Sequence, residues 1–284
     1  MSIKEMRRLA AMRPVGPVPE VAKVEDFTVA GPGGVQIPVR IYRPIRIKAP
    51  TPPVIYFHGG GWVVGGLDTH DGRARRLANY SGCTIISVDY RLAPEHKFPA
   101  AFEDAMAVAR WISRSAGYIG VTPGKFGVCG DSSGGNLAAA VALAARDEGL
   151  PLGVQVLIYP VLDNRPDLYR SYRAYADGYF LTRQGMDWFL DQYIPAESRA
   201  DWRAAPMRAT NLVGVAPTMI ITVEMDVLRD EGEDYAVRLD AYGVPTSLVR
   251  YSGMFHGSFG LTHLIDAAVD MHIDAAAMLA SYLT

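Results

Sequence analysis

The stretch Val128–Asn136 reads VCGDSSGGN and places two adjacent serines among glycines. Gly130, Ser132 and Gly134 match the pattern G-x-S-x-G, which here lies between the apolar run FGVC and an alanine-rich helical stretch. On a tight strand-to-helix turn the serine is strained, and side chains two residues away on either side would collide with the turn. This spacing selects Ser132, not Ser133, as the candidate nucleophile. Taken alone, the pattern also fits a helix entry whose serine is only an N-cap.

Outside this stretch, the chain repeats an apolar run of strand length, a glycine-containing turn and a helical stretch. Apolar strands that alternate with helices are typical of a mainly parallel sheet with helices on both sides, so we predict an α/β fold. A further β-segment, 35–43, is predicted at an edge of the sheet because Pro38 lacks an N–H. The strands predicted within the repeating pattern are 54–57, 84–88, 126–129, 154–159, 219–223 and 247–251.

One interval, 161–215, is much longer than a crossover between strands requires. It contains the stretch 163–194, which is rich in Tyr, Phe and Trp and has a helical pattern in its second half. Apolar residues at helical spacing also predict a short amphipathic helix in the first dozen residues. We expect a single domain over residues 1–284, with a helical cap formed by about 1–20 and about 161–210.

The composition of the chain limits its possible partners and indicates its cellular compartment. The chain has 284 residues and a net charge of −2, with no long run of Lys or Arg, so nucleic acid is not an expected partner. Cys83 and Cys129 each lie in an apolar run and are predicted to be core residues in a reducing compartment. The first residues lack the apolar region of a signal peptide, and no apolar run is long enough to span a bilayer. We therefore expect a cytoplasmic protein that does not bind membranes.

A serine hydroxyl becomes a good nucleophile only when a base removes its proton. Three histidines follow Ser132 in the chain: His256, His263 and His272. His256 follows the strand-like run SLVRY in the glycine-flanked loop SGMFHGS, which makes it the candidate base. The other two lie in the C-terminal helical stretch, where a surface or packing role is expected.

The base needs a carboxylate to orient it, and several follow the predicted strand TMIITV. Asp226 lies in the loop after this strand and is the candidate acid, while Glu224 stays open as an alternative. Asp230 and Glu231 fall in the first turn of the next predicted helix, where the helix dipole is a sufficient reason for negative charge.

Acyl transfer through a serine also requires N–H donors for the negative oxygen of the tetrahedral intermediate. The stretch FHGGGW, 57–62, directly follows the first predicted parallel strand, where an HGGG-type donor loop belongs. Successive glycines let the backbone turn its amides into a cavity. The amide of Ser133 is the expected remaining donor, so its hydroxyl should be dispensable. These elements, in this order, predict a serine hydrolase.

Five blocks of the sequence together resemble the hormone-sensitive-lipase-like esterases, bacterial lipase family IV of the α/β-hydrolase superfamily. They are HGGGW, DYRLAPEHKFPAAFED, GDSSGGN, DVLRDEGEDYAVRL and GMFHG. The resemblance runs from about residue 24 to the C-terminus. Because Asp131 precedes the serine, this sequence resembles the branch of the family that carries GDSAG. Three departures from the family pattern are Ser133 for alanine, Val227 for proline and Ser258 for an aromatic residue. The shorter N-terminal region implies a thinner cap and a more open acyl site.

The resemblance implies an α/β-hydrolase fold and the hydrolysis of short- to medium-chain acyl esters through an acyl-enzyme. It implies a small-molecule ester as substrate and no cofactor, and it is compatible with a homodimer. No metal is expected, on the ligand spacing discussed below. The residues it assigns are Ser132, Asp226 and His256 as the catalytic triad, Gly60, Gly61 and Ser133 as the oxyanion hole, and His58, Gly59, Gly130, Asp131 and Gly134 as supporting motif residues.

Other polar residues have simpler interpretations. In DYRLAPE, the charged residues Asp89, Arg91 and Glu95 are expected to form internal ion pairs. His70 and His96 lack the partners at ligand spacing that a metal site requires. Two rival functions are amide cleavage on the same fold and ligand binding without turnover. Retention of the candidate base disfavours the second.

Overall fold

The computed structural model describes residues 2–12, 16–45 and 50–284. Within these residues an eight-stranded sheet lies at the centre, in the order β1-β2-β4-β3-β5-β6-β7-β8. The β1–β2 and β2–β4 pairs are antiparallel and the remaining pairs are parallel, which confirms the predicted, mainly parallel sheet. The strands are β1 (Lys23–Ala30), β2 (Gln36–Arg43), β3 (Pro53–Phe57), β4 (Thr84–Val88), β5 (Phe126–Asp131), β6 (Leu152–Ile158), β7 (Thr218–Met225) and β8 (Thr246–Phe255).

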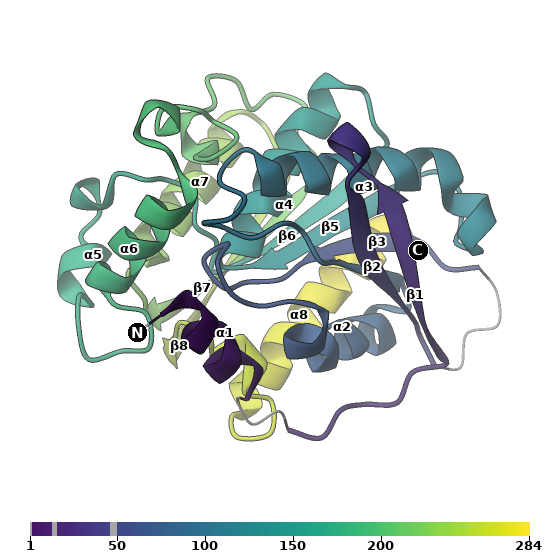
Figure 1. Cartoon of the computed structure of the whole chain (residues 1–284), viewed down its shortest axis with the longest axis horizontal. Helices are drawn as coiled ribbons and strands as arrows, with labels where there is room; N and C mark the ends of the chain where they lie inside the picture. The colour runs from purple at the N-terminus through teal and green to yellow at the C-terminus, as the bar shows by residue number, and fades with distance from the viewer. Residues whose placement is uncertain (1, 13–15, 46–49) are drawn as a thin grey trace.

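Helices cover both faces of the sheet, as Figure 1 shows. Residues of α2 and α8 share one apolar core with the sheet, and residues of α3, α4 and α7 share the core on the opposite face. Every residue of β3 and β4 is buried, as expected for parallel strands covered on both sides. The α-helices are α1 (Ile3–Ala11), α2 (Leu67–Ser81), α3 (Ala100–Ser115), α4 (Ser133–Asp147), α5 (Ser171–Ala174), α6 (Arg183–Tyr193), α7 (Arg229–Ala241) and α8 (Asp266–Leu283). Short 3-10 helices span Pro32–Gly34, Ala116–Ile119, Pro166–Leu168, Ala196–Ser198, Pro206–Arg208 and Ser258–Gly260.

The prediction that segment 35–43 is an edge strand is wrong. This segment is β2, which lies between β1 and β4. The carbonyl of Pro38 accepts the N–H of Asp89 at 3.0 Å, just beyond Val39 and Val88, the last residue pair of the β2–β4 ladder. In an antiparallel strand the N–H and C=O of one residue point to the same side. The missing N–H of Pro38 therefore falls where that ladder ends and disrupts no pairing.

The edge strand on this side of the sheet is β1, which the sequence patterns did not predict. Its sequence, KVEDFTVA, shows no clean alternation, and only Val29 is buried in it. An edge strand exposed on most of its surface has little need for an apolar face, so periodicity gives little signal there.

The long interval before β7 contains α5, α6 and several short 3-10 helices. Helix α6 lies in the second half of 163–194, where a helical pattern is predicted, so that prediction is confirmed. Figure 1 shows α5 and α6 together at one end of the molecule, beyond the sheet. The predicted N-terminal helix is α1. Of the expected cap segment 1–20, residues 1 and 13–15 lie outside the described residues.

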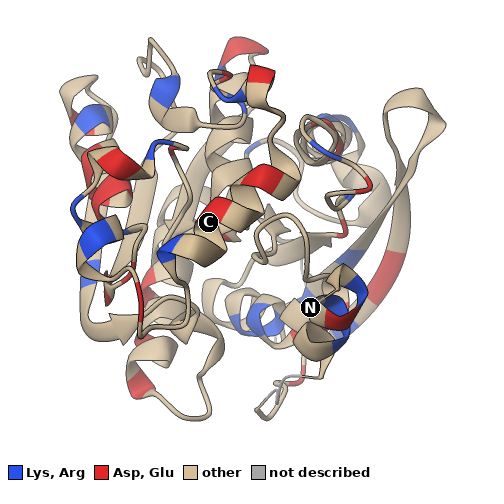
Figure 2. Cartoon of the chain, turned by 60° about the vertical axis from the view of Figure 1, so that its left-hand side comes forward, with Lys and Arg blue, Asp and Glu red and all other residues tan. Residues whose placement is uncertain are grey.

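The surface carries both signs of charge. In Figure 2, basic and acidic residues are interspersed, and α1 itself carries both. Cys83 and Cys129 are buried and unpaired, as predicted. In the part of the chain that the structure describes, no helix is both long enough and apolar enough to cross a bilayer.

Candidate active site

Ser132 is the single residue between the end of β5 and the start of α4, and it has φ 57° and ψ −120°. A positive φ is costly for a residue with a side chain and persists only where the surroundings hold it. Here the N–H of Ser132 donates to the carbonyl of Ile158 at 2.8 Å, and its own carbonyl accepts the N–H of Val161 at 3.2 Å. The turn is therefore fixed against the end of β6.

The two glycines that flank this turn are required by close backbone contacts. A Cβ on Gly130 would lie 2.2 Å from the carbonyl oxygen of Gly134. A Cβ on Gly134 would lie 2.0 Å from the carbonyl oxygen of Phe57 at the end of β3. The spacing G-x-S-x-G thus follows from how tightly the turn packs.

Ser132, His256 and Asp226 form a continuous chain of hydrogen bonds. His256 Nε2 lies 3.0 Å from Ser132 Oγ, and His256 Nδ1 lies 2.7 Å from Asp226 Oδ2. With its proton on Nδ1, the imidazole donates to Asp226 and accepts from Ser132. All three residues are buried, and they follow β5, β8 and β7. The carboxyl ends of three strands thus bring together residues that are far apart in the sequence.

The alternative acid, Glu224, faces elsewhere. Its Oε2 accepts the N–H of Gly253 at 2.7 Å, in the loop that leads to His256. Asp226 instead turns one oxygen to His256 and accepts the N–H of Leu228 on the other at 3.0 Å. Of the two carboxylates left open by the sequence, Asp226 is therefore the one that contacts the imidazole.

The other two downstream histidines lie away from Ser132. His263 is exposed in the turn before α8. His272 is buried, stacks on Phe259 at 3.7 Å and donates to the carbonyl of Ala268 at 2.8 Å. Burial lowers the pKa of His272 to about 3, so this ring stays neutral. The predicted packing role is confirmed for His272.

The glycine loop that follows β3 has the conformation of a tight turn. Gly60 and Gly61 have φ of 125° and 59°, a region that favours glycine. A Cβ on Gly60 would lie 2.1 Å from the carbonyl oxygen of Val64, and a Cβ on Gly61 would lie 2.2 Å from the ring of Phe189. Ser133, the other expected donor, is the first residue of α4 and is buried.

Asp131 connects this loop to the serine turn. Its Oδ1 accepts the hydroxyl of Tyr56 at 2.5 Å and the N–H of Gly59 at 3.2 Å. Its Oδ2 lies 3.7 Å from His70 Nε2 and 3.9 Å from Arg73 Nη1. Burial raises the pKa of Asp131, but the charge of Arg73 and the contacts with His70 and Tyr56 outweigh it, so the pKa lies well below its usual value. The carboxylate is ionised when it holds the loop.

His58 supports the loop from the other side. Its buried ring stacks on Tyr90 at 4.3 Å, and the hydroxyl of Tyr90 donates to the carbonyl of His58 at 2.7 Å. His58 Nδ1 lies 2.9 Å from the carbonyl oxygen of Gly59. Burial, together with the nearby His70, lowers the pKa of His58 to about 4, which keeps it neutral. The ring therefore acts as a packed hydrogen-bond donor.

The charged residues of DYRLAPE have mostly structural partners, as predicted. Arg91 pairs with the buried Asp104 at 2.8 Å, and Glu95 pairs with Arg7 at 2.7 Å. Asp89 is different, because it forms no ion pair with any described residue, and burial raises its pKa. The prediction is therefore confirmed for two of the three.

Tyr159 is a site residue that the sequence did not reveal. It directly follows β6, has φ 35°, and places its ring 4.5 Å from the ring of His256. A non-glycine residue with positive φ packed against His256 is one more strained position at this site. No sequence signal marks it, because both the strain and the contact depend on the fold.

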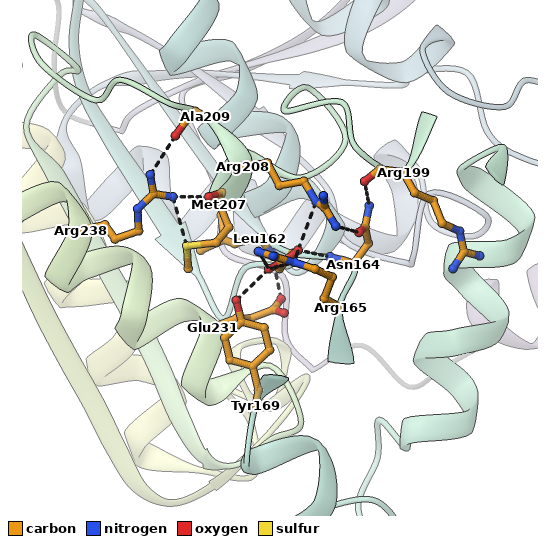
Figure 3. Close-up of polar contacts among 11 residues, drawn as sticks. Leu162, Asn164, Arg165, Tyr169, Arg199, Met207, Arg208, Ala209, Glu231 and Arg238 are labelled. Carbon is orange, nitrogen blue, oxygen red and sulfur yellow. Dashed lines mark hydrogen bonds and ion pairs between the residues drawn. The ribbon is translucent and has the colours of Figure 1, made fainter. Parts of the chain in front are cut away.

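Glu231 is more than a partner for the helix dipole. It lies in the first turn of α7, as predicted, but it is fully buried and accepts the N–H of Leu162 at 2.8 Å (Figure 3). Burial raises the pKa of Glu231 well above its usual value. The hydrogen bond from the Leu162 N–H lowers this pKa, and the charges of Asp163 and Asp226 raise it, but burial dominates. The neighbouring Asp163 is held by Arg165 at 2.7 Å. The helix dipole alone does not account for so deeply buried a carboxyl.

The segment between β6 and β7 contacts the site at two points. Phe189 of α6 packs on Gly61, as the close approach above shows, and a Cβ on Gly257 would lie 3.2 Å from the ring of Phe180. Two aromatic rings from one segment therefore stand next to the glycine loop and next to the residue after His256. Within the described residues, no group of three or more His, Cys, Asp or Glu side chains could hold a metal ion.

Comparisons with known proteins agree with this architecture. A family model described as alpha/beta hydrolase fold matches residues 54–260. The chain belongs to the alpha/beta hydrolase family. Carboxylesterase NlhH of Mycobacterium tuberculosis is 40% identical to this alpha/beta hydrolase over 259 residues, which cover 89% of this chain and 80% of NlhH. Ethyl acetate hydrolase of Pseudomonas putida is 37% identical over 254 residues, covering 86% and 78%.

Solved structures give the same result. EstE1, a thermophilic carboxylesterase cloned from a metagenomic library, superposes on this alpha/beta hydrolase with a TM-score of 0.95 and 39% identity, covering 100% of this chain and 98% of EstE1. An esterase of Pyrobaculum calidifontis gives a TM-score of 0.91 and 40% identity, covering 99% and 94%. The resemblance inferred from the signature blocks is confirmed at the level of the family.

Proposed function

We propose that this alpha/beta hydrolase is a serine carboxylesterase that acts on short- to medium-chain acyl esters. The observation that carries the proposal is the hydrogen-bonded chain from Ser132 through His256 to Asp226, with distances of 3.0 and 2.7 Å. A hydroxyl paired to an imidazole that is itself oriented by a buried carboxylate is the arrangement that activates a serine. The names of the relatives, among them an ethyl acetate hydrolase, support ester substrates.

The reaction proceeds in two steps through an acyl-enzyme. His256 takes the proton of Ser132 as Oγ attacks the ester carbonyl, and the protonated imidazole then delivers this proton to the departing alcohol. In the second step His256 activates a water molecule, which releases the carboxylic acid and restores Ser132. Asp226 orients the imidazole and stabilises its charged form.

The proposed oxyanion hole consists of the N–H groups of Gly60, Gly61 and Ser133. The positive φ of both glycines and the position of Ser133 at the start of α4 support this assignment. Donors fixed before the reaction stabilise the developing negative charge without reorganisation, and the loss of one costs about 10²- to 10³-fold in kcat. The glycine flanks and Asp131, with His58 and Gly59, hold these donors in place.

We further propose that the chain acts as one catalytic domain, with a cap made of about 1–20 and about 161–210. The contacts of Phe189 with Gly61 and of Phe180 with Gly257 support a cap over the site. The proposal also includes a cytoplasmic location, supported by the unpaired cysteines, and a homodimer, which light scattering on the purified protein tests.

The proposed function is tested with a chain-length series of p-nitrophenyl esters, from acetate upward, on three proteins. The wild type should release p-nitrophenol fastest from short acyl esters. Ser132→Ala should abolish this release, and Ser133→Ala should keep most of it, because only its backbone N–H is used. Activity that survives Ser132→Ala and disappears in a folded Ser133→Ala would contradict the assignment. Labelling of the wild type by a fluorophosphonate, absent in Ser132→Ala, provides an independent readout.

A further inference from the structure

Arg7, on α1, forms hydrogen bonds with three residues far along the chain. Its Nε donates to the carbonyl of Val63 at 2.8 Å, and its Nη2 donates to the carbonyl of Ala93 at 3.0 Å. The two Nη atoms also grip the carboxylate of Glu95 at 2.9 and 2.7 Å. A planar guanidinium with donors in a fixed fork is suited to hold several acceptors in one geometry. No residue of α1 is fully buried, so the helix is attached by this fork together with the partly buried Ile3, which packs against the apolar core.

The acceptors of Arg7 belong to the glycine loop and to the segment packed against it. Val63 is buried and donates its N–H to the carbonyl of Gly60 at 3.1 Å, which closes the turn of the glycine loop. Ala93 donates its N–H to the carbonyl of Trp62 at 2.8 Å. Arg7 therefore bridges two segments that are already hydrogen-bonded to each other: the C-terminal end of the glycine loop, at Val63, and the segment that contains Ala93.

The next residue on the helix provides a natural comparison. Arg8 pairs with Glu5 of the same helix at 2.7 Å, and its other hydrogen bond, to Met12, is also local. Both arginines have the same charge and lie on the same helix, but only Arg7 contacts the glycine loop. A variant of Arg8 therefore controls for loss of charge and for changes to α1 itself.

We propose that Arg7 is a positioning residue for the oxyanion hole. Its guanidinium fixes the carbonyl of Val63 relative to Ala93 and Glu95, and so sets where the turn presents the amides of Gly60 and Gly61. This inference rests on the proposed function of those two amides. A displacement of about 1 Å in a catalytic group can cost about 10²-fold in rate, so a modest shift of the turn has a measurable effect.

The simpler alternative is that Arg7 only anchors α1. The two hypotheses predict changes in different measured quantities. If Arg7 places the oxyanion donors, its loss weakens binding of the transition state more than binding of the substrate, so kcat falls while KM changes little. If it only anchors the helix, the unfolding temperature falls and kcat at low temperature stays near the wild-type value.

The experiment compares Arg7→Ala with Arg8→Ala on p-nitrophenyl butyrate. We expect kcat of Arg7→Ala to fall about tenfold with KM within about twofold, and Arg8→Ala to stay within about twofold in both. A trifluoromethyl ketone forms a hemiketal whose oxygen occupies the oxyanion hole, so its Ki should rise in Arg7→Ala by about the same factor as kcat/KM falls. Millimolar guanidinium should restore part of kcat in Arg7→Ala and none in Arg8→Ala.

Equal kcat and equal Ki in the two variants would overturn the inference, whatever their unfolding temperatures. If Arg7→Ala does not fold, Arg7→Lys and Glu95→Gln take its place, because each weakens the hydrogen bonds of the Arg7 guanidinium without removing all of them. Each should give a smaller fall in kcat of the same kind. Failure of the proposed function looks different: the wild type would then hydrolyse no ester, or Ser132→Ala would remain active.

Discussion

The carboxylate of Asp131 accepts the backbone N–H of Gly59 at 3.2 Å, across 72 positions of sequence. Asp131 directly precedes the candidate nucleophile, and Gly59 directly precedes the proposed oxyanion donors. One side chain therefore couples the two loops whose relative position decides whether the attacking oxygen and the donors meet at one carbonyl group. The hydroxyl of Tyr56, from β3, donates to the same carboxylate oxygen at 2.5 Å.

Asp131→Asn tests this coupling through its dependence on pH. The amide keeps an acceptor for Tyr56 and Gly59 but loses the charge that faces Arg73. Because the folded pKa of Asp131 lies below its usual value of 3.8, the charged form contributes stability above about pH 4, and this contribution disappears as the pH falls below it. We expect Asp131→Asn to be about 2 kcal/mol less stable than the wild type at pH 7, a typical value for a charged hydrogen bond.

Urea unfolding of both proteins at pH 7 and at pH 3 measures this difference. It should shrink at the lower pH, since Asp131 then begins to bind a proton in the unfolded wild type while the folded carboxylate stays ionised. A difference that is the same at both pH values would mean that the charge of Asp131 contributes nothing. Ester hydrolysis at pH 7 should fall in parallel, because the acceptor of the Gly59 N–H is then uncharged and holds the glycine loop less firmly.

Glu231→Gln should show the opposite sign. The folded pKa of Glu231 lies well above 4.5, so between these two values the folded state holds a proton that the unfolded state has lost. Wild-type stability from this group therefore falls as the pH rises from about 4.5, by at most about 1.4 kcal/mol per pH unit. Glutamine has no proton to lose and can still accept the N–H of Leu162.

The measurement is the free energy of unfolding of Glu231→Gln and wild type from pH 4 to pH 8. The variant should gain stability relative to the wild type as the pH rises. Glu233→Gln, two residues along the same helix, is the matched control, because Glu233 pairs with Arg250 at the surface. A gain that does not grow with pH would show that Glu231 titrates as an ordinary carboxyl.

Asp226→Asn and Glu224→Gln separate the two carboxylates that the sequence left open. Replacing the acid of a serine triad by its amide lowers kcat by about 10⁴-fold, because the imidazole takes the wrong tautomer. We expect a loss of this size for Asp226→Asn. Glu224→Gln should stay within about threefold, since an amide oxygen can still accept the N–H of Gly253. A large loss in Glu224→Gln with little change in Asp226→Asn would reverse the assignment.

Local patterns in the sequence were sufficient for the features that depend on neighbours in the chain. The glycines around Ser132 were readable because a strained turn restricts residues two positions away, and the buried strands were readable because both of their faces are apolar. Candidate partners on the loops after later strands followed from the order of elements. The two carboxylates near position 226 could not be separated, because they differ only in the direction in which each side chain points.

The features that the sequence did not provide are set by contacts across the fold. Pro38 suggested an edge strand, but whether a missing N–H matters depends on where the neighbouring ladder ends. The fork of Arg7 and the burial of Glu231 likewise depend on acceptors that lie far away in the chain. A single arginine in an amphipathic helix and a glutamate in a first helical turn have ordinary local explanations, which hide these contacts.

Gly134→Ala tests the claim that packing, and not flexibility, requires glycine beside the nucleophile. The added Cβ would lie 2.0 Å from the carbonyl oxygen of Phe57 and 2.7 Å from that of His58. Both atoms belong to the backbone where β3 enters the glycine loop, so neither can rotate away. Relief requires the helix α4 to move from the sheet, which displaces Ser132 and the amide of Ser133 together. We therefore expect ester hydrolysis to fall by at least about 10²-fold, the cost of misplacing catalytic groups by about 1 Å.

Gly117→Ala is the matched control, because a Cβ there meets no atom within 4 Å and the residue is exposed. Gly117 does not have a positive φ, so alanine can adopt its backbone conformation. Alanine also reduces the conformational freedom of the unfolded chain. We expect wild-type activity and a change in stability between zero and a gain of about 1 kcal/mol. Thermal unfolding and p-nitrophenyl butyrate hydrolysis of both variants complete the test. A folded Gly134→Ala protein with wild-type kcat would show that the turn can relax, and the steric basis for selecting Ser132 would then be lost.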